Sequence, residues 1–267
     1  MYPQREMFAL SPLALVAVEI RFTDAARMRQ QQTKDAIAIA LEHRFPFAEP
    51  LQQTEFNLLP AGPPQIEQRA GVVLKNTKST ESLTLMSQSI SYETTEYASF
   101  DPLLEAIAAA CDALKESGVR PALQRIGLRY IDEIRVPGDI SDVRDWKTWI
   151  DERLMSSLSI GPAEAIITSA QGLNTYDLGG GRGMNFRYAA LNQAPVVAPT
   201  HLRRRAIESG PFFVLDFDGF QDFTGGDPVE LETDVVRASL QAVHVPCGTT
   251  FQQSITEEAR SLFRGEQ

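Results

Sequence analysis

Two aspartates at the end of an apolar run are the residues of this chain best suited to chemistry. Residues 212–220 read FFVLDFDGF, so Asp216 and Asp218 stand two positions apart, just before a glycine. An aspartate at the end of a buried strand can attack phosphorus as a nucleophile, with a second aspartate as general acid and Mg²⁺ holding the phosphate. This stretch therefore raises the question of a phosphate-transferring enzyme.

The rest of the chain does not complete such a site. The mechanism also requires a Lys, a Ser or Thr and a further acidic pair, all supplied by later parallel strands. The 47 residues after Phe220 read as two helices and contain no Lys. No Gly-x-Ser-x-Gly motif of a serine hydrolase is present either. We therefore predict no catalytic residues, no metal and no cofactor; the sequence leans against an enzyme without deciding the question.

The alternation of a β-strand explains the same residues without a catalytic role. On an extended strand, Asp216 and Asp218 share one face, while Phe213, Leu215 and Phe217 share the other and belong to the core. Two carboxylates placed in this way repel each other unless cations lie opposite. They therefore predict a positively charged neighbour.

The segment 123–136, LQRIGLRYIDEIRV, offers such a neighbour. It alternates as a strand, with Arg125, Arg129 and Arg135 on one face. We expect the two strands to contact each other through a mixed-charge ladder that contributes about a few tenths of a kcal/mol per pair. The alternative is that both faces line a polar groove that binds a ligand.

Other suggestive motifs have simpler explanations. GGGRG at 179–183 resembles a phosphate-binding loop, but strand-like segments flank it on both sides, so it predicts a hairpin loop. The basic run Arg203–Arg205 predicts a solvated loop, with a local site for an anion or an acidic partner as the alternative. His43, His201 and His244 each lack a second ligand at metal-binding spacing. We expect His244 to lie at the C-terminal end of a helix.

The composition is that of an acidic globular protein. The chain has 267 residues, 43% hydrophobic and 22% charged, and a net charge of −10. A phosphate backbone repels such a chain, so nucleic acid is not an expected partner. The apolar run Phe8–Val18 predicts a strand rather than a signal peptide, because Pro12 interrupts it and no small-residue cleavage site follows. No run reaches the roughly 18 apolar residues of a membrane span. Only two cysteines occur, Cys111 and Cys247, and we predict a cytoplasmic protein in which Cys111 is packed rather than reactive.

Periodicities along the chain predict an α+β protein. We expect strands at 13–23, 51–59, 65–75, 81–95, 123–136, 163–178, 183–191 and 211–220, and helices at 24–44, 99–117, 141–157, 228–244 and 254–264. Consecutive strands without intervening helices are antiparallel neighbours, so antiparallel sheets should pack against helices. The order α-β-β-β-α occurs in 24–117 and again in 141–244. It predicts two pseudo-repeated halves, 1–138 and 139–267, or one continuous domain.

The run RIGLRYIDEI at 125–134 is similar to the central motif of a sporadically distributed family of uncharacterised bacterial proteins of similar length. Supporting stretches occur in the family's order at Val18–Phe22, Tyr97–Phe100, 145–150, 215–218 and 251–256. Asp132 stands where the family usually has asparagine. The resemblance implies no activity and no catalytic residues. The patchy distribution of the family implies an accessory role, such as a part of a toxin–antitoxin or phage-defence system.

These observations favour a non-enzymatic, acidic module that binds and regulates another protein, encoded by a neighbouring gene. The absence of a complete catalytic set of residues and the charged strand faces support this prediction. The alternative is an enzyme or a small-molecule sensor that uses a polar groove lined by Asp and Arg. The predicted binding residues are Arg125, Arg129, Tyr130, Asp132, Arg135, Asp216 and Asp218.

Overall fold

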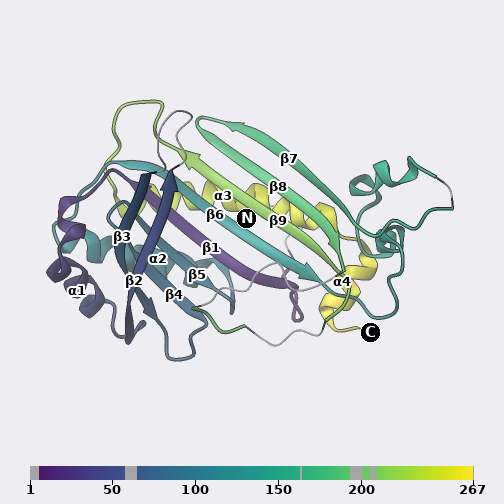
Figure 1. Cartoon of the computed structure of the whole chain (residues 1–267), viewed down its shortest axis with the longest axis horizontal. Helices are drawn as coiled ribbons and strands as arrows, with labels where there is room; N and C mark the ends of the chain where they lie inside the picture. Colours follow the sequence, from purple (N-terminus) through teal and green to yellow (C-terminus); the bar gives the residue numbers. More distant parts are fainter. Residues whose placement is uncertain (1–5, 58–64, 163, 193–200, 205–208, 267) are drawn as a thin grey trace.

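The computed structural model describes residues 6–57, 65–162, 164–192, 201–204 and 209–266. They form a nine-stranded sheet in the order β2-β3-β4-β5-β1-β6-β9-β8-β7, in which all neighbouring strands are antiparallel (Figure 1). The strands are β1 (Leu13–Phe22), β2 (Phe47–Asn57), β3 (Gln65–Lys75), β4 (Glu81–Leu85), β5 (Ser89–Thr94), β6 (Leu123–Ile134), β7 (Ala170–Gly179), β8 (Arg182–Leu191) and β9 (Phe212–Asp222).

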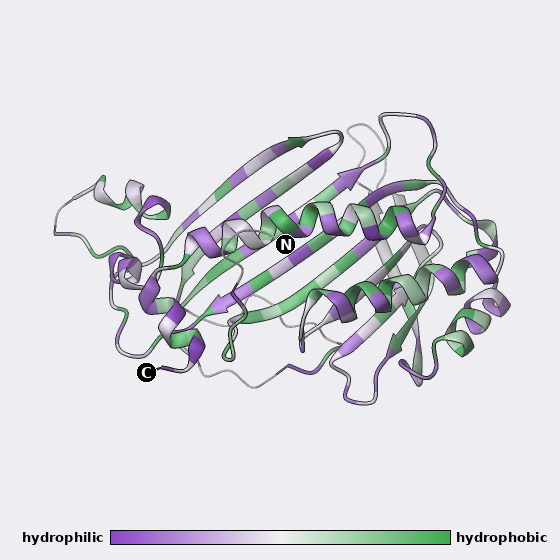
Figure 2. Cartoon of the chain, turned by 180° about the vertical axis from the view of Figure 1, so that it is seen from behind, coloured by the Kyte–Doolittle hydropathy of each residue, from purple (hydrophilic) through white to green (hydrophobic). Residues whose placement is uncertain are grey.

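Helices α2 and α3 lie across one face of this sheet (Figure 2). The α-helices are α1 (Gln31–Ala40), α2 (Phe100–Glu116), α3 (Thr233–Ser254) and α4 (Glu257–Arg264). Short 3-10 helices are η1 (Ala26–Arg29), η2 (Val143–Thr148), η3 (Glu152–Leu154) and η4 (Ser156–Ser159). The predicted α+β class, with antiparallel strands packed against helices, is confirmed.

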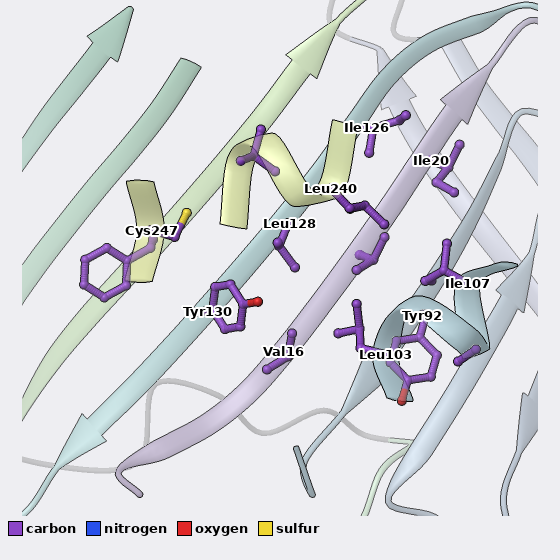
Figure 3. Packing of buried hydrophobic residues seen from close by; sticks show 14 of the residues in the cluster. Val16, Ile20, Tyr92, Leu103, Ile107, Ile126, Leu128, Tyr130, Leu240 and Cys247 are labelled. Carbon is purple, nitrogen blue, oxygen red and sulfur yellow. The ribbon is translucent and has the colours of Figure 1, made fainter. Parts of the chain in front are cut away.

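The core lies between the sheet and these two helices. Alternation along β1 and β6 turns Val16, Ile20, Ile126 and Leu128 toward α2 and α3, and each is buried (Figure 3). The apolar stripe of α2 covers them and includes Cys111, which is fully buried as predicted. Burial removes apolar surface from water and stabilises this arrangement.

Several predicted elements are wrong in detail. The strand 81–95 is a hairpin, because Met86 N donates to the Ser89 carbonyl oxygen at 2.9 Å and reverses the chain between β4 and β5. The helix 141–157 is a series of 3-10 turns, because the side chains of Asp142 and Asp151 each accept a backbone hydrogen bond and restart the turn.

The order of elements does not show the predicted pseudo-repeat. Four strands, β2 to β5, separate α1 from α2, whereas three strands, β7 to β9, separate the 3-10 turns from α3. The pairing of β6 with β9 continues the sheet across residue 138, the predicted boundary between halves.

Helix α3 extends beyond its predicted end at 244. Pro246 lies inside it, and the helix continues to Ser254. A proline removes one backbone hydrogen bond from a helix, and packing of the next two turns on the sheet offsets this loss. His244 is therefore in the middle of α3 and not at its C-terminal end. Within the ranges given above, no helix is long and apolar enough to cross a membrane.

Candidate functional site

The two charged strands contact each other as the sequence predicts. β6 pairs with β9, and Arg129 lies opposite Asp218 in the register. Arg129 donates from Nε and Nη2 to the two carboxylate oxygens of Asp216, both at 2.7 Å, and this contact raises the pKa of Arg129. Arg125 lies 3.5 Å from Asp218. The predicted mixed-charge ladder is confirmed for Arg125 and Arg129.

Strand β8 adds further donors to the same carboxylates. Arg187 Nη1 lies 3.5 Å from Asp216, and Asn185 donates to Asp218 at 3.3 Å. The Asp216 side chain is only 7% exposed. Because both aspartates are surrounded by hydrogen-bond donors in the middle of an antiparallel strand, this arrangement supports a structural pairing of charges and not a nucleophile.

Gly219 of the same stretch has a packing role. A Cβ atom at this position would lie 2.9 Å from Cys247 Sγ and 3.1 Å from Val243 Cβ, both on α3. The absence of a side chain therefore allows α3 to approach β9 closely. The glycine that suggested a catalytic loop belongs to a contact between helix and sheet.

Arg135 makes contacts separate from this ladder. Its guanidinium lies 4.6 Å from the centre of the Phe212 ring, and Nη1 donates to the Gly210 carbonyl oxygen at 3.2 Å. The nearby Arg204 pairs with Glu133, and the backbone N–H of Arg203 donates to the Ser79 carbonyl oxygen at 2.6 Å. Of the predicted basic run, Arg205 lies outside the described residues.

An aromatic pocket lies on the opposite, helix-facing side of the sheet. It has a volume of about 140 Å³. Its aromatic walls are Phe8, Tyr97, Tyr130, Phe217 and Phe251. Since these side chains come from five different segments of the chain, only the tertiary fold brings them together.

Two of the predicted binding residues line this pocket. Alternation along β6 turns Tyr130 and Asp132 to the same side as the core residues Ile126 and Leu128. Figure 3 shows Tyr130 on this side, near Cys247 of α3. The sequence thus predicted β6 as a binding strand. It did not predict that Tyr130 and Asp132 would belong to one site and the arginines to the opposite face.

Asp132 is the unusual residue of the pocket. It is 4% exposed, and burial together with the nearby Asp216 charge raises the pKa of its carboxyl to about 8. Among the described residues, no side chain or backbone group forms a hydrogen bond or ion pair with this carboxyl. A buried polar group without a partner costs free energy, so Asp132 differs sharply from the well-paired Asp216.

A hydrogen bond and ring contacts fix the wall beside Asp132. Tyr130 Oη and His244 Nδ1 are 2.9 Å apart, and the His244 ring stacks on Phe100 with 3.9 Å between the ring centres. Tyr97 contacts Tyr130 edge to face at 5.8 Å. The pocket wall is therefore held by residues of α2, α3 and β6 before any ligand arrives.

The N-terminal segment closes another side of the pocket. Arg264 of α4 donates to the two carboxylate oxygens of Glu6 at 2.5 and 2.9 Å, and holds the pKa of Glu6 below its usual value. Phe8 packs edge to face on Phe251 and Phe263. These contacts hold the segment against α3 and α4. The pocket therefore combines residues from the two ends of the chain, such as Phe8 and Phe251.

His244 and Phe251 were not among the binding residues predicted from the sequence. The available signal was the spacing of Leu240, His244, Cys247 and Phe251 at i, i+4, i+7 and i+11, which defines one face of a helix. The predicted helix end at 244 left Cys247 and Phe251 off that face.

Comparison with known proteins identifies no relative: no family model matches the chain, and no curated protein matches it. The resemblance of 125–134 to an uncharacterised bacterial family therefore stays a prediction. Across the parts of the chain that the structure describes, no three His, Cys, Asp or Glu side chains gather closely enough to hold a metal ion.

Proposed function

We propose that the protein binds a small molecule in the aromatic pocket and acts as a ligand-binding or sensor module. The observation that carries this proposal is the buried carboxyl of Asp132 in the pocket wall, which has no partner among the described residues. Small-molecule sites typically combine apolar walls with a few polar groups and a perturbed pKa. The proposed site differs from the Asp- and Arg-lined groove of the sequence-based alternative, because it lies on the other face of β6.

Binding explains the site better than catalysis does. A catalytic site requires a reacting group together with a second group that exchanges protons with it. Cys247 lines the pocket, but burial raises the pKa of its thiol to about 12, so it is not a thiolate nucleophile near neutral pH. The arrangement supports recognition by one polar anchor within a rigid aromatic wall.

A thermal-shift screen of small charged and neutral compounds tests this proposal. A ligand present at 100 times its Kd adds about 2.7 kcal/mol to the free energy of unfolding, which raises the Tm by roughly 5–10 °C for a chain of this size. The matched variant is Ser99→Trp, which places a large side chain in the pocket because Ser99 lines it. The Ser99 side chain makes no capping hydrogen bond at the start of α2, so the substitution removes no such bond. The proposal fails if no compound stabilises the wild type, or if Ser99→Trp responds equally.

The expected protein-binding function is the second candidate. One observation favours it: on the sheet face opposite α2 and α3, Arg129 and Arg187 remain nearly half exposed despite their contacts with Asp216. A partner with an acidic surface would bind there by electrostatic complementarity. A protein that co-purifies with the wild type and with Ser99→Trp, but not with Arg187→Glu, would support it. Equal recovery with Arg187→Glu would exclude this face.

A cytoplasmic location remains part of the proposal. Both Cys111 and Cys247 are free and buried, and free thiols of this kind suit a reducing compartment. Fractionation of cells that produce the tagged protein would test it.

A further inference from the structure

Resting on the proposed function, we infer that the ligand of the aromatic pocket is a small organic amine whose ammonium group pairs with Asp132. This inference specifies the chemical class of the ligand, which the proposed function leaves open. It depends on the charges that line the pocket, on its aromatic walls and on its size.

The charges around the pocket favour a cation. Its lining includes two acidic residues, Glu6 and Asp132, and no Lys or Arg among the described lining residues. Arg264 and Arg260 of α4 already pair with Glu6, at 2.5 and 3.3 Å. Asp132 is therefore the acidic group whose charge no cation of the described chain balances. When it loses its proton, this carboxyl would repel an anionic ligand, whereas an ammonium ion would supply the balancing charge.

The aromatic walls support the same class of ligand. The rings of Phe8, Tyr97, Tyr130, Phe217 and Phe251 surround the space beside Asp132. The face of an aromatic ring attracts a cation, and groups of such rings are a common means of recognising amines. Rings also provide apolar contact for the hydrocarbon part of the ligand. A carboxylate beside several rings therefore matches an amine that carries an apolar body.

The volume limits the size of the ligand. The pocket measures about 140 Å³. A protein cavity of about 150 Å³ accommodates one benzene molecule. The ligand class is accordingly a monoamine with a single ring, or with a short aliphatic chain, and 2-phenylethylamine is a suitable probe.

Proton release provides a second signature of the same pairing. Burial and the Asp216 charge favour the protonated form of Asp132, so pairing with an ammonium ion requires the carboxyl to lose a proton to the solvent. The other ionisable groups around it are Glu6 on the N-terminal segment, His244 and Cys247 on α3, and Tyr97 and Tyr130. Glu6 is already ionised by its contacts with Arg264, and burial keeps the Cys247 thiol protonated.

Titration calorimetry with 2-phenylethylamine and its neutral analogue 2-phenylethanol tests the inference. We expect the wild type to bind the amine more tightly than the alcohol and to release up to one proton at pH 7, measured in buffers of different ionisation enthalpy. Asp132→Asn keeps the shape of the side chain but removes its charge, and should weaken amine binding about 10- to 100-fold. Asp218→Asn is the matched control, since it removes one carboxylate from the opposite face, and it should leave amine binding unchanged.

Two outcomes would overturn the inference. If the alcohol binds the wild type as tightly as the amine, or Asp132→Asn retains amine binding, the ligand is not recognised as a cation, although the pocket still binds small molecules. If 2-phenylethylamine and a short alkylamine such as butylamine both fail to bind the wild type, the ligand class is wrong. The broader screen then decides the proposed function separately, because it includes neutral and anionic compounds.

Discussion

Replacing Asp132 by asparagine should stabilise the protein in neutral and alkaline solution. The substitution keeps the shape of the side chain but removes a carboxyl that is buried in the pocket wall. In the unfolded chain this carboxyl has its ordinary pKa of 3.8, whereas in the folded protein its pKa is about 8. The folded state therefore holds a proton that the unfolded state has lost over the range between these two values.

The sign and size of the effect follow from proton linkage. Wherever the folded state binds more protons, the free energy of unfolding falls as the pH rises, by about 1.36 kcal/mol per pH unit for one group. The wild type should therefore lose stability between pH 4 and pH 8 relative to Asp132→Asn. Over the full range the difference reaches on the order of 5 kcal/mol, an upper limit because movement of the pocket wall lowers the cost of the charge.

Urea unfolding of both proteins at pH 4.5, 6.0, 7.0 and 8.5 measures this difference. The variant should match the wild type near pH 4.5 and exceed it increasingly above that pH. Asp218→Asn is the control, because it removes a carboxylate of the same sheet that contacts Arg125 and Asn185, and it should not reproduce this trend. If the difference between Asp132→Asn and the wild type is the same at pH 4.5 and pH 8.5, the carboxyl has no raised pKa and the reasoning about the pocket is refuted.

Three further predictions concern other parts of the molecule. Arg129→Met leaves the 7%-exposed Asp216 with the more distant Arg187 as its one remaining cation among the described residues, so it should lower the free energy of unfolding by about 2 kcal/mol in urea titration. Asp216→Asn in the same chain should recover part of this loss. Arg264→Ala removes two of the hydrogen bonds to Glu6, so limited proteolysis should cleave the segment 6–12 faster while cleavage elsewhere is unchanged; equal rates would show that the remaining contacts, such as those of Arg260 with Glu6 and of Phe263 with Phe8, are enough to hold the segment. Because burial raises the pKa of the Cys111 and Cys247 thiols to about 12, a thiol reagent at pH 8 should modify both only as the protein unfolds, and rapid labelling of the native protein would contradict their burial.

The strand pattern could be predicted from the sequence because alternation directly reports which face of a strand is buried. Phe213, Leu215 and Phe217 are buried on the helix side, and Asp216 and Asp218 lie on the other face, as their spacing indicates. The same periodicity placed Arg125 and Arg129 opposite these aspartates. Local sequence was sufficient here because both partners are neighbours in one sheet.

The helical elements were less predictable because tertiary contacts override local signals. Pro246 is a helix breaker by local criteria, yet α3 continues past it, with Cys247 and Phe251 packed toward the sheet. In 143–148, the spacing of Val143 and Trp146 suits an α-helix, but the Asp142 side chain satisfies the backbone of a 3-10 turn. The spacing of the apolar residues reveals neither the continuation of α3 past Pro246 nor the 3-10 turns at 143–148.

The pocket could not be predicted because its walls come from distant segments. Phe8 and Phe251 are in contact although more than 240 residues separate them, and Arg264 secures the segment that carries Phe8. Sequence patterns identify the neighbours of a residue along one helix or strand. They contain no information on which end of the chain will cover a given end of the sheet.

The contrast between Asp132 and Asp216 is the strongest reason to regard the pocket as a binding site. Both are buried aspartates on adjacent strands of one sheet, and they face opposite sides of it. The fold places Arg129 and Arg187 beside Asp216, so its charge is balanced within the chain. No group of the described residues forms a hydrogen bond with the carboxyl of Asp132, where an asparagine of the same shape would avoid the cost of burying a charge. A carboxyl that destabilises the folded chain as the pH rises, in a pocket with preformed aromatic walls, is best explained by a partner that comes from outside the chain and carries a positive charge.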